Sequence, residues 1–146
     1  MRVVVQDAPF DFGQEADAFA TGHTVSGAIV TFTGVVRDVA GGLKAMEIEH
    51  YPGMTEAALT EIAGQAVTRW SLEDALVIHR YGTLAPGEMI MMVATAARHR
   101  KDAFEAAEYL MDYLKSRAPF WKREVTADGA EWVAARAVDE DALNRW

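Results

Sequence analysis

The sequence of 146 residues contains no cysteine. The chain therefore cannot form a disulfide, bind zinc or an iron–sulfur cluster through cysteine, or use a thiol nucleophile. Serine is also scarce. Its three occurrences, Ser26, Ser71 and Ser116, all lie outside the Gly-x-Ser-x-Gly pattern of serine hydrolases. Any chemistry must therefore rest on His, Lys, Arg, Asp, Glu or backbone groups.

Other absences narrow the class of protein further. No apolar run is long enough to span a membrane, and Val3–Val5 is too short an apolar run for a signal peptide. Acidic residues outnumber basic ones by 22 to 14, which argues against general nucleic-acid binding. The four histidines lack metal-binding spacing. We expect a cytoplasmic protein with no metal or cofactor and no affinity for nucleic acid or membranes.

The chain is 51% hydrophobic and 25% charged, as globular domains are, so its length predicts one domain over residues 1–146. In the first half, residues 2–6 predict a strand and 13–20 one or two helical turns. Two further strands, 28–37 and 43–51, are expected to pair as a hairpin through Gly41-Gly42. Phe32 on the first of them is expected in the core. Apolar spacing predicts a helix up to Trp70 with Thr55 as its N-cap.

The second half alternates strands with one more long helix. Strands are predicted at 75–81 and 88–96, and the second is apolar on both faces, which is typical of a central strand. A helix over 102–116 is expected to bury a stripe of Phe104, Ala107, Met111 and Leu114. Strands 120–126 and 130–134 form a predicted hairpin at Asp128-Gly129. The tail, about 137–146, is flexible or a short helix. The predicted class is α+β, with mixed and antiparallel strands, two main helices and β-hairpins.

Charge is distributed unevenly along this chain. The segment from Arg98 to Arg123 holds seven basic and four acidic residues, a net charge of +3, and the rest of the chain carries −11. A basic segment in an acidic chain indicates an anionic ligand such as a phosphate or carboxylate. The alternative is the solvated face of a helix.

Three candidate binding groups follow from position alone. His99 and Arg100 stand where a predicted strand meets a helix, whose free N–H groups can hold an anion. Arg37 ends a strand, as a surface charge or as a fork for phosphate or carboxylate. His79 alternates with apolar residues in a strand, which indicates a structural role.

Lys115 and Lys122 flank the break at Ala118-Pro119, so both side chains can face one cleft. Two ammonium groups close together disfavour protonation, and the pKa of one lysine would fall, giving a nucleophile or general base. Alternatively, Lys115 only complements the helix dipole and Lys122 is a solvated strand residue.

Taken together, these segments resemble the catalytic (large) subunit family of molybdopterin synthase, over roughly residues 25–136. The matching stretches run in the family's order, and the Lys-x-x-Ala-Pro-Phe-Trp-Lys block is highly specific. They are Gly27–Arg37, Glu47–Met54, Val77–Gly82, His99-Arg100 with Ala103-Phe104, and Met111–Glu124. The resemblance implies an α/β-hammerhead-like fold.

The resemblance also implies a reaction. Cyclic pyranopterin monophosphate would receive two sulfurs and become the dithiolene molybdopterin. The donor would be the C-terminal Gly-Gly thiocarboxylate of a small ubiquitin-like subunit, whose tail enters a pocket of the large subunit. The family assembles as a homodimer of large subunits with one small subunit at each end, a heterotetramer in which the neighbouring large subunit helps to complete the pocket.

Carried over by resemblance, Lys115 and Lys122 are the catalytic lysines, and Lys115 is expected nearest the thiocarboxylate. The residues implied in substrate binding are these two lysines together with Val35, Val36, Arg37, His99, Arg100, Arg123, Glu124 and Arg136. Val35 departs from the basic residue frequent in the family, and Arg98 replaces a small residue.

Two other functions remain open from the sequence. A non-catalytic module could bind the tail of a ubiquitin-like protein without reactive lysines. A phosphate-ester hydrolase could use the basic segment, but the chain offers neither metal ligands nor an obvious nucleophile for it.

Overall fold

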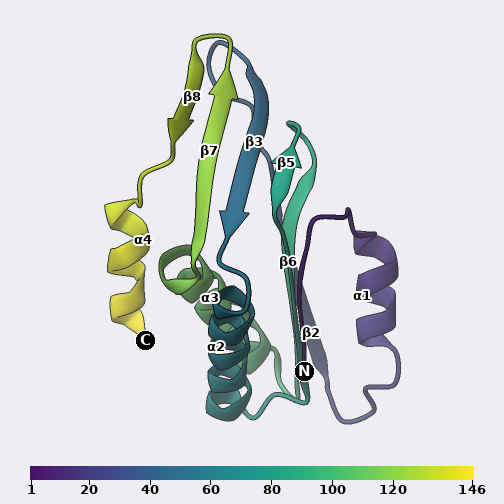
Figure 1. Cartoon of the computed structure of the whole chain (residues 1–146). Helices are drawn as coiled ribbons and strands as arrows, with labels where there is room; N and C mark the ends of the chain where they lie inside the picture. The colour runs from purple at the N-terminus through teal and green to yellow at the C-terminus, as the bar shows by residue number, and fades with distance from the viewer.

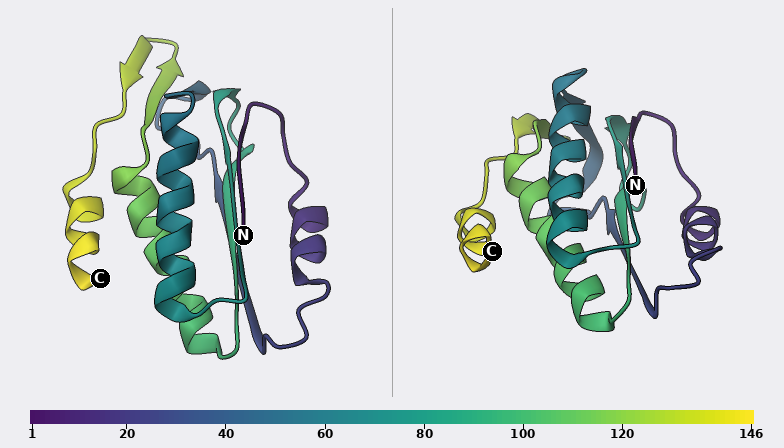
Figure 2. Two further views of the ribbon diagram at one scale, coloured as in Figure 1. Left: turned by 60° about the horizontal axis from the view of Figure 1, so that its bottom comes forward. Right: turned by 90° about the horizontal axis from the view of Figure 1, so that it is seen from below.

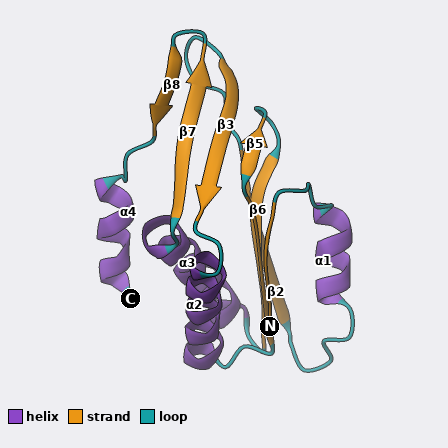
Figure 3. Cartoon of the chain, in the orientation of Figure 1, coloured by secondary structure: helices purple, strands orange, loops and turns teal.

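Two four-stranded sheets carry the architecture of the computed structural model, which describes residues 1–146 (Figures 1 and 3). Sheet A has the strand order β1-β4-β6-β2 and sheet B the order β5-β3-β7-β8. The strands are β1 (Arg2–Gln6), β2 (Ala28–Val35), β3 (Leu43–His50), β4 (Asp74–Arg80), β5 (Gly82–Leu84), β6 (Met89–Ala97), β7 (Phe120–Thr126) and β8 (Gly129–Trp132). The helices are α1 (Phe12–Ala20), α2 (Met54–Trp70), α3 (Arg100–Arg117) and α4 (Ala137–Ala142), followed by a 3-10 turn at Leu143–Arg145. The α+β class is confirmed.

Helices cover both faces of sheet A. In Figure 2, α2 and α3 lie side by side on one face and α1 lies on the other. Every residue of β6 after Met89 is buried, because this strand lies between β4 and β2 and has helices on both sides. The prediction of a central strand is confirmed. Its side chains are apolar on both faces because one face packs against α2 and α3 and the other against α1.

The expected hairpin between residues 28–37 and 43–51 is wrong. Strand β2 pairs with β6 in sheet A, whereas β3 pairs with β5 and β7 in sheet B. The connection separates the strands because it is held at both ends: Val36 N donates to Glu88 O at 2.8 Å, and Asp38 Oδ1 accepts from Leu43 N at 2.6 Å. Gly41-Gly42 does turn the chain, but it turns it into the second sheet.

Helix α2 begins two residues earlier than predicted. Thr55 lies inside the helix rather than at its N-cap, which is Gly53 with a φ of 84°. Glu56 Oε2 accepts from Gly53 N at 2.8 Å and satisfies a free donor of the first turn. The Thr55 hydroxyl accepts from Tyr51 N and donates to Pro119 O at 3.2 Å. Thr55 therefore ties the start of α2 to the corner between α3 and β7.

Helix α3 is confirmed, but its predicted apolar stripe is partly wrong. Phe104 is 62% exposed, whereas Ala103, Ala106 and Leu110 are buried together with Ala107 and Leu114. Small alanines let the helix lie close to sheet A, which turns Phe104 outward. Phe32 is 43% exposed and not in the core, because β2 is the last strand of its sheet.

The C-terminal tail is the short helix of the two expected alternatives, and it is fixed to α3. Asp112 accepts hydrogen bonds from the Arg145 guanidinium and, at 2.6 Å, from the indole Nε1 of Trp146. Arg117 forms an ion pair with Glu140 at 2.8 Å. This places α4 beside the end of α3. The three-residue strand β5 was not predicted, because so short a segment carries no pattern.

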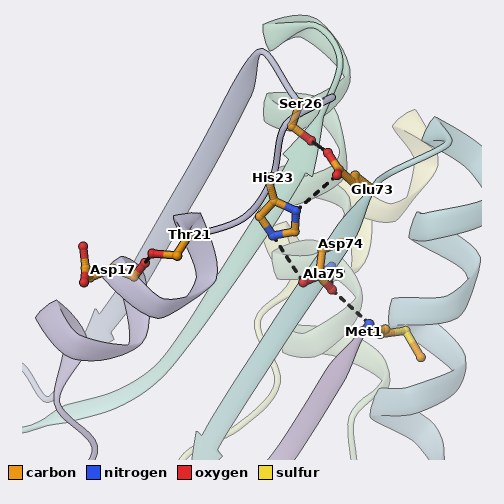
Figure 4. A network of polar contacts seen from close by, with 8 residues as sticks. All are labelled: Met1, Asp17, Thr21, His23, Ser26, Glu73, Asp74 and Ala75. Carbon is orange, nitrogen blue, oxygen red and sulfur yellow. Dashed lines mark hydrogen bonds and ion pairs between the residues drawn. The ribbon is translucent and has the colours of Figure 1, made fainter.

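A polar network holds the loop between α1 and β2 against the start of β4 (Figure 4). The His23 ring lies 3.5 Å from Glu73 and 3.4 Å from Asp74. Ser26 donates to Glu73, and the amino group of Met1 pairs with Asp74 at 2.9 Å. This network sets where β2 enters sheet A. None of the helices is both long and apolar enough to cross a membrane.

Candidate functional site

The corner between α3 and β7 brings Lys115 and Lys122 together. Helix α3 ends at Arg117, because the residue before Pro119 is disfavoured in helical geometry, and β7 begins at Phe120. Lys115 is exposed, whereas Lys122 is partly buried and pairs in register with the buried Ile48 of β3. Burial and then the Lys115 charge lower the pKa of Lys122, and Asp139 of α4 opposes them. The charge of Lys115 therefore acts on Lys122, as their spacing in the sequence predicts.

Aromatic rings pack beneath Lys122 on the same face of β7. Phe120, two residues before it, stacks on the ring of His79 with centroids 3.7 Å apart. Burial lowers the pKa of His79 to about 3, so this ring is neutral near pH 7 and its Nδ1 donates to Arg80 O at 2.8 Å in that tautomer. His79 is thus the packed, structural histidine that the sequence indicated, and it lines an apolar floor under the lysine.

Arg123 and Glu124 continue along β7 but divide between its faces. The Arg123 guanidinium pairs with Glu47 and lies 5.3 Å over the Trp132 ring, on the face opposite Lys122. Glu124 lies on the Lys122 face, two residues further on. Arg136 precedes α4, is exposed and makes no side-chain hydrogen bond or ion pair. The carboxylate that acts on Lys122 is Asp139, which has no distinguishing sequence pattern.

Val35 is the last residue of β2, and Val36 and Arg37 follow it directly. Val36 is buried and bonds through both backbone groups, to Glu88 O and from Gly87 N, each at 2.8 Å. Val35 is 47% exposed, and Arg37 is exposed with no side-chain hydrogen bond or ion pair. The backbone of Val36 is therefore fixed, whereas the guanidinium of the next residue, Arg37, is free.

His99 and Arg100 lie at the start of α3, as predicted. His99 is the N-cap in an extended conformation, and no side chain caps the helix, so its first N–H groups are free. Gly27 N donates to Arg98 O at 3.2 Å, and a Cβ at Gly27 would stand 2.6 Å from that oxygen. Only glycine permits this approach, which holds the strand-to-helix junction in place.

One chain does not bring all of these residues together. Arg100 and Lys115 are 15 residues apart on one helix, which is about 22 Å at 1.5 Å per residue. Arg37 is also far from His99, because Ala28 pairs with Ala97 at one end of β2 and Val35 with Met89 at the other. The predicted set therefore forms separate groups: the lysine corner, the strand end at Arg37, and the helix start at His99-Arg100.

An open hollow of about 410 Å³ lies on sheet B, with Trp121 and Trp132 on the face opposite Lys122. It is lined by Glu49, His50, Tyr51, Trp121 and Trp132. No sequence pattern indicated it, because β3 pairs with β7 across 70 residues or more. Aromatic walls of this kind suit an extended peptide or a flat ring. No group of three or more His, Asp or Glu side chains has the geometry of a metal site.

Comparison with known proteins gives a consistent result over the whole chain. The model of the family described as MoaE protein matches residues 5–117, which includes Lys115 and ends before Lys122. A relative from Cereibacter sphaeroides, named molybdopterin synthase catalytic subunit, is 69% identical, with 100% of each chain covered.

Two solved structures extend this likeness to the fold. A MoaE protein from Burkholderia ambifaria is 49% identical with a TM-score of 0.85, covering 99% of this chain and 97% of its own. The crystal structure of molybdopterin synthase from Staphylococcus aureus is 30% identical with a TM-score of 0.81, covering 89% and 95%. The extent of the family-model match and these identities establish that the chain belongs to the MoaE protein family.

Proposed function

We propose that this chain is the catalytic subunit of a molybdopterin synthase and transfers sulfur to cyclic pyranopterin monophosphate, forming the dithiolene of molybdopterin. The observation that carries the proposal is the lysine corner. Lys122 is partly buried over an apolar floor and lies in the field of Lys115. Family membership supplies the reaction, and the corner supplies groups able to perform its proton transfers.

The two lysines would have different roles. Because the pKa of Lys122 is lowered, its amine is more readily neutral and can accept and return a proton during carbon–sulfur bond formation. Lys115 is exposed at the end of α3 and would hold the anionic thiocarboxylate and stabilise developing charge. This assigns the proton transfer to Lys122 and keeps Lys115 as the residue expected nearest the thiocarboxylate.

The phosphate of the substrate needs cations that are not already paired. Arg37 and Arg100 make no ion pair, and the N-cap His99 lies at the free helix N-terminus. Hydrogen bonds from arginine to phosphate are charge-assisted, each worth ~1.5–3 kcal/mol. Because about 22 Å of helix separates Arg100 from Lys115, a second copy of the chain would supply His99 and Arg100 to each lysine corner. Val35, Val36, Glu124 and Arg136 would line the same pocket, and Arg123 would brace its outer wall through Glu47.

The sulfur must come from elsewhere, because this chain has no cysteine to carry it. The donor would be the C-terminal Gly-Gly thiocarboxylate of a small ubiquitin-like subunit. The aromatic hollow formed by Tyr51, Trp121 and Trp132 lies on sheet B and can receive an extended, side-chain-free tail. The complex would be a heterotetramer built on a dimer of this chain. We place this chemistry in the cytoplasm, where the absence of cysteine has no cost.

A reconstituted assay tests the function. The purified chain is mixed with a thiocarboxylated small subunit and cyclic pyranopterin monophosphate, and dithiolene product is measured. Lys122→Ala is expected to lower the rate at least 100-fold, the scale of general acid–base catalysis, with binding of the small subunit unchanged. Lys44→Ala is the matched control, because Lys44 is an exposed lysine of sheet B.

Two results would contradict the proposal. A wild-type chain that binds the small subunit but forms no product would be the non-catalytic binding module. A Lys122→Ala chain with a near-normal rate would remove Lys122 from the chemistry.

A further inference from the structure

A buried arginine that the proposed mechanism does not use lies at the end of β4. Arg80 is 6% exposed and is the only buried residue that is charged near pH 7, because the buried His79 is neutral. Its Nε and Nη2 donate to Asp7 O at 3.0 and 2.8 Å, and its Nη1 lies 3.6 Å from Glu88 Oε1. Replacing a buried ion pair with apolar side chains is often neutral or stabilising. Stability alone therefore does not explain an arginine at this position.

Glu88, the partner of Arg80, holds the turn between β5 and β6. Its Oε2 accepts from Ala85 N at 2.5 Å, and its own N donates to Ala85 O at 3.1 Å. Its backbone oxygen accepts from Val36 N at 2.8 Å, and the neighbouring Gly87 N donates to Val36 O at the same distance. The carboxylate of Glu88 thus closes the turn, and two backbone hydrogen bonds tie the turn to the residue that follows β2.

Arg37 comes next in the chain after Val36 and has a free side chain. It is exposed, and its guanidinium makes no hydrogen bond or ion pair. Glu88 pairs with Arg80 rather than with Arg37, and one of its oxygens also accepts from Ala85 N. The charge of Arg80 offsets that of Glu88, so this carboxylate does not compete with an anion for Arg37. The same contacts therefore fix the backbone beside Arg37 and keep its guanidinium available.

We propose that Arg80 and Glu88 are positioning residues that set where Arg37 presents its guanidinium to an anionic substrate. Arg80 is anchored on Asp7 O, and Glu88 links it to the backbone of Val36, one residue before the free guanidinium. A fixed backbone reduces the ordering that binding an anion requires. The positioning follows from these contacts alone. That the anion is the phosphate of cyclic pyranopterin monophosphate rests on the proposed function.

Steady-state kinetics of sulfur transfer separate positioning from stability. Glu88→Ala is expected to raise the KM for cyclic pyranopterin monophosphate at least 10-fold and to leave kcat within twofold, because a weaker hold on the phosphate affects ground state and transition state alike. Arg80→Lys should do the same although it keeps the charge, since one ammonium cannot replace a planar fork that reaches both Asp7 O and Glu88. Arg2→Met is the matched control, because it removes an arginine of sheet A that pairs with Glu15 at 2.7 Å.

A double variant tests whether Glu88 acts through Arg37. Arg37→Ala should itself raise the KM, because it removes the guanidinium that binds the phosphate. In that background Glu88→Ala should raise the KM by less than a further twofold, since the side chain that it positions is gone. A further 10-fold rise in the double variant would show that Glu88 acts by another route and would overturn the inference. Wild-type KM values in both Glu88→Ala and Arg80→Lys chains would also overturn it.

Amide hydrogen exchange tests the positioning without the reaction. In Glu88→Ala the Val36 N–H should exchange at least 10-fold faster, because the turn that accepts its hydrogen bond is no longer closed. The Leu72 N–H, bonded to Val67 O at 3.0 Å after α2, should keep its rate. Circular dichroism confirms that each variant folds. Equal acceleration at Val36 and Leu72 would mean a general loss of stability and would reject the positioning role.

The two measurements also separate this inference from the proposed function. A wild-type chain that forms no product would reject the function, and the exchange of the Val36 N–H would still decide the positioning. An active wild type, with neither the KM nor the exchange rate changed in Glu88→Ala, would reject the positioning and leave the function standing. Faster exchange at Val36 with an unchanged KM would also overturn the inference, because Arg37 would then not bind the substrate anion.

Discussion

The two sheets of this molecule differ in how they are stabilised. In sheet A, β4 and β6 are buried nearly throughout and hold most of the core. In sheet B, no residue of β7 is fully buried and all of β8 is exposed. The candidate catalytic lysine belongs to the second sheet. A loosely packed sheet tolerates a partly buried cation, so the chain keeps its stability in one sheet and its reactive group in the other.

The largest expected effect comes from deleting a core side chain of sheet A. Ile78 of β4 is fully buried, so Ile78→Ala should lower the free energy of unfolding by about 3–4 kcal/mol through lost burial and an unfilled cavity. Trp121→Ala in sheet B removes a larger side chain that is 48% exposed, and should cost about 1 kcal/mol or less. Urea unfolding of the two variants measures both values. Equal losses would show that the sheets are stabilised alike.

A pH dependence should follow from His79, which lies where the two sheets meet. Its folded pKa of about 3 is below the ordinary 6.5, so the unfolded chain takes up a proton first as the pH falls. Stability is therefore lost as the pH falls from 6.5 towards 3, by up to about 1.4 kcal/mol per pH unit from this group. Between pH 6 and 4, His79→Phe should show a flatter loss of stability than the wild type.

The control is His23→Gln, because His23 is more accessible and lies beside Glu73 and Asp74 rather than in the core. If His79→Phe and the wild type lose stability in parallel, the buried histidine is not the source of the acid sensitivity.

The strands of sheet A could be predicted from the sequence because their apolar patterns are local and strong. The apolar runs of β1, β4 and β6 are long enough to identify strands, and an apolar pattern on both faces identifies β6 as central. Sheet B could not be read so well. Strands β3 and β7 pair across 70 residues or more, from Ile48 to Lys122 for example, and no local pattern specifies such a partner. The predicted hairpin between β2 and β3 was wrong because it paired strands that are neighbours in the sequence, whereas the partners of β3 lie further along the chain.

The candidate site divides in the same way. Lys115 and Lys122 are seven residues apart across a sharp break, so their approach follows from local geometry, and the structure shows it. Asp139, which acts on Lys122, comes from α4 through tertiary packing and has no local signal. The separation of Arg100 from Lys115 was already implied by the rise of the predicted helix. The sequence could not predict the outward turn of Phe104, which depends on how closely the alanines of α3 approach the sheet. Nor could it predict the exposure of Phe32, which follows from the position of β2 as the last strand of its sheet.

The smallest expected effect is a gain in stability on sheet B. Lys122→Met keeps the length and packing of the side chain and removes a charge that burial and Lys115 both disfavour. Stability should rise by about 0.5–2 kcal/mol near pH 7, while sulfur transfer is lost. Because the folded pKa of Lys122 lies below its ordinary value of 10.5, the wild type is at a disadvantage only below pH 10.5, and the gain should shrink as the pH is raised towards that value. Thermal unfolding at pH 7 and pH 9.5 measures the difference, with Lys44→Met as the exposed control. A Lys122→Met chain less stable than the wild type at pH 7 would mean that the lysine is held by favourable contacts, and the contrast between a stabilising sheet and a reactive one would fail.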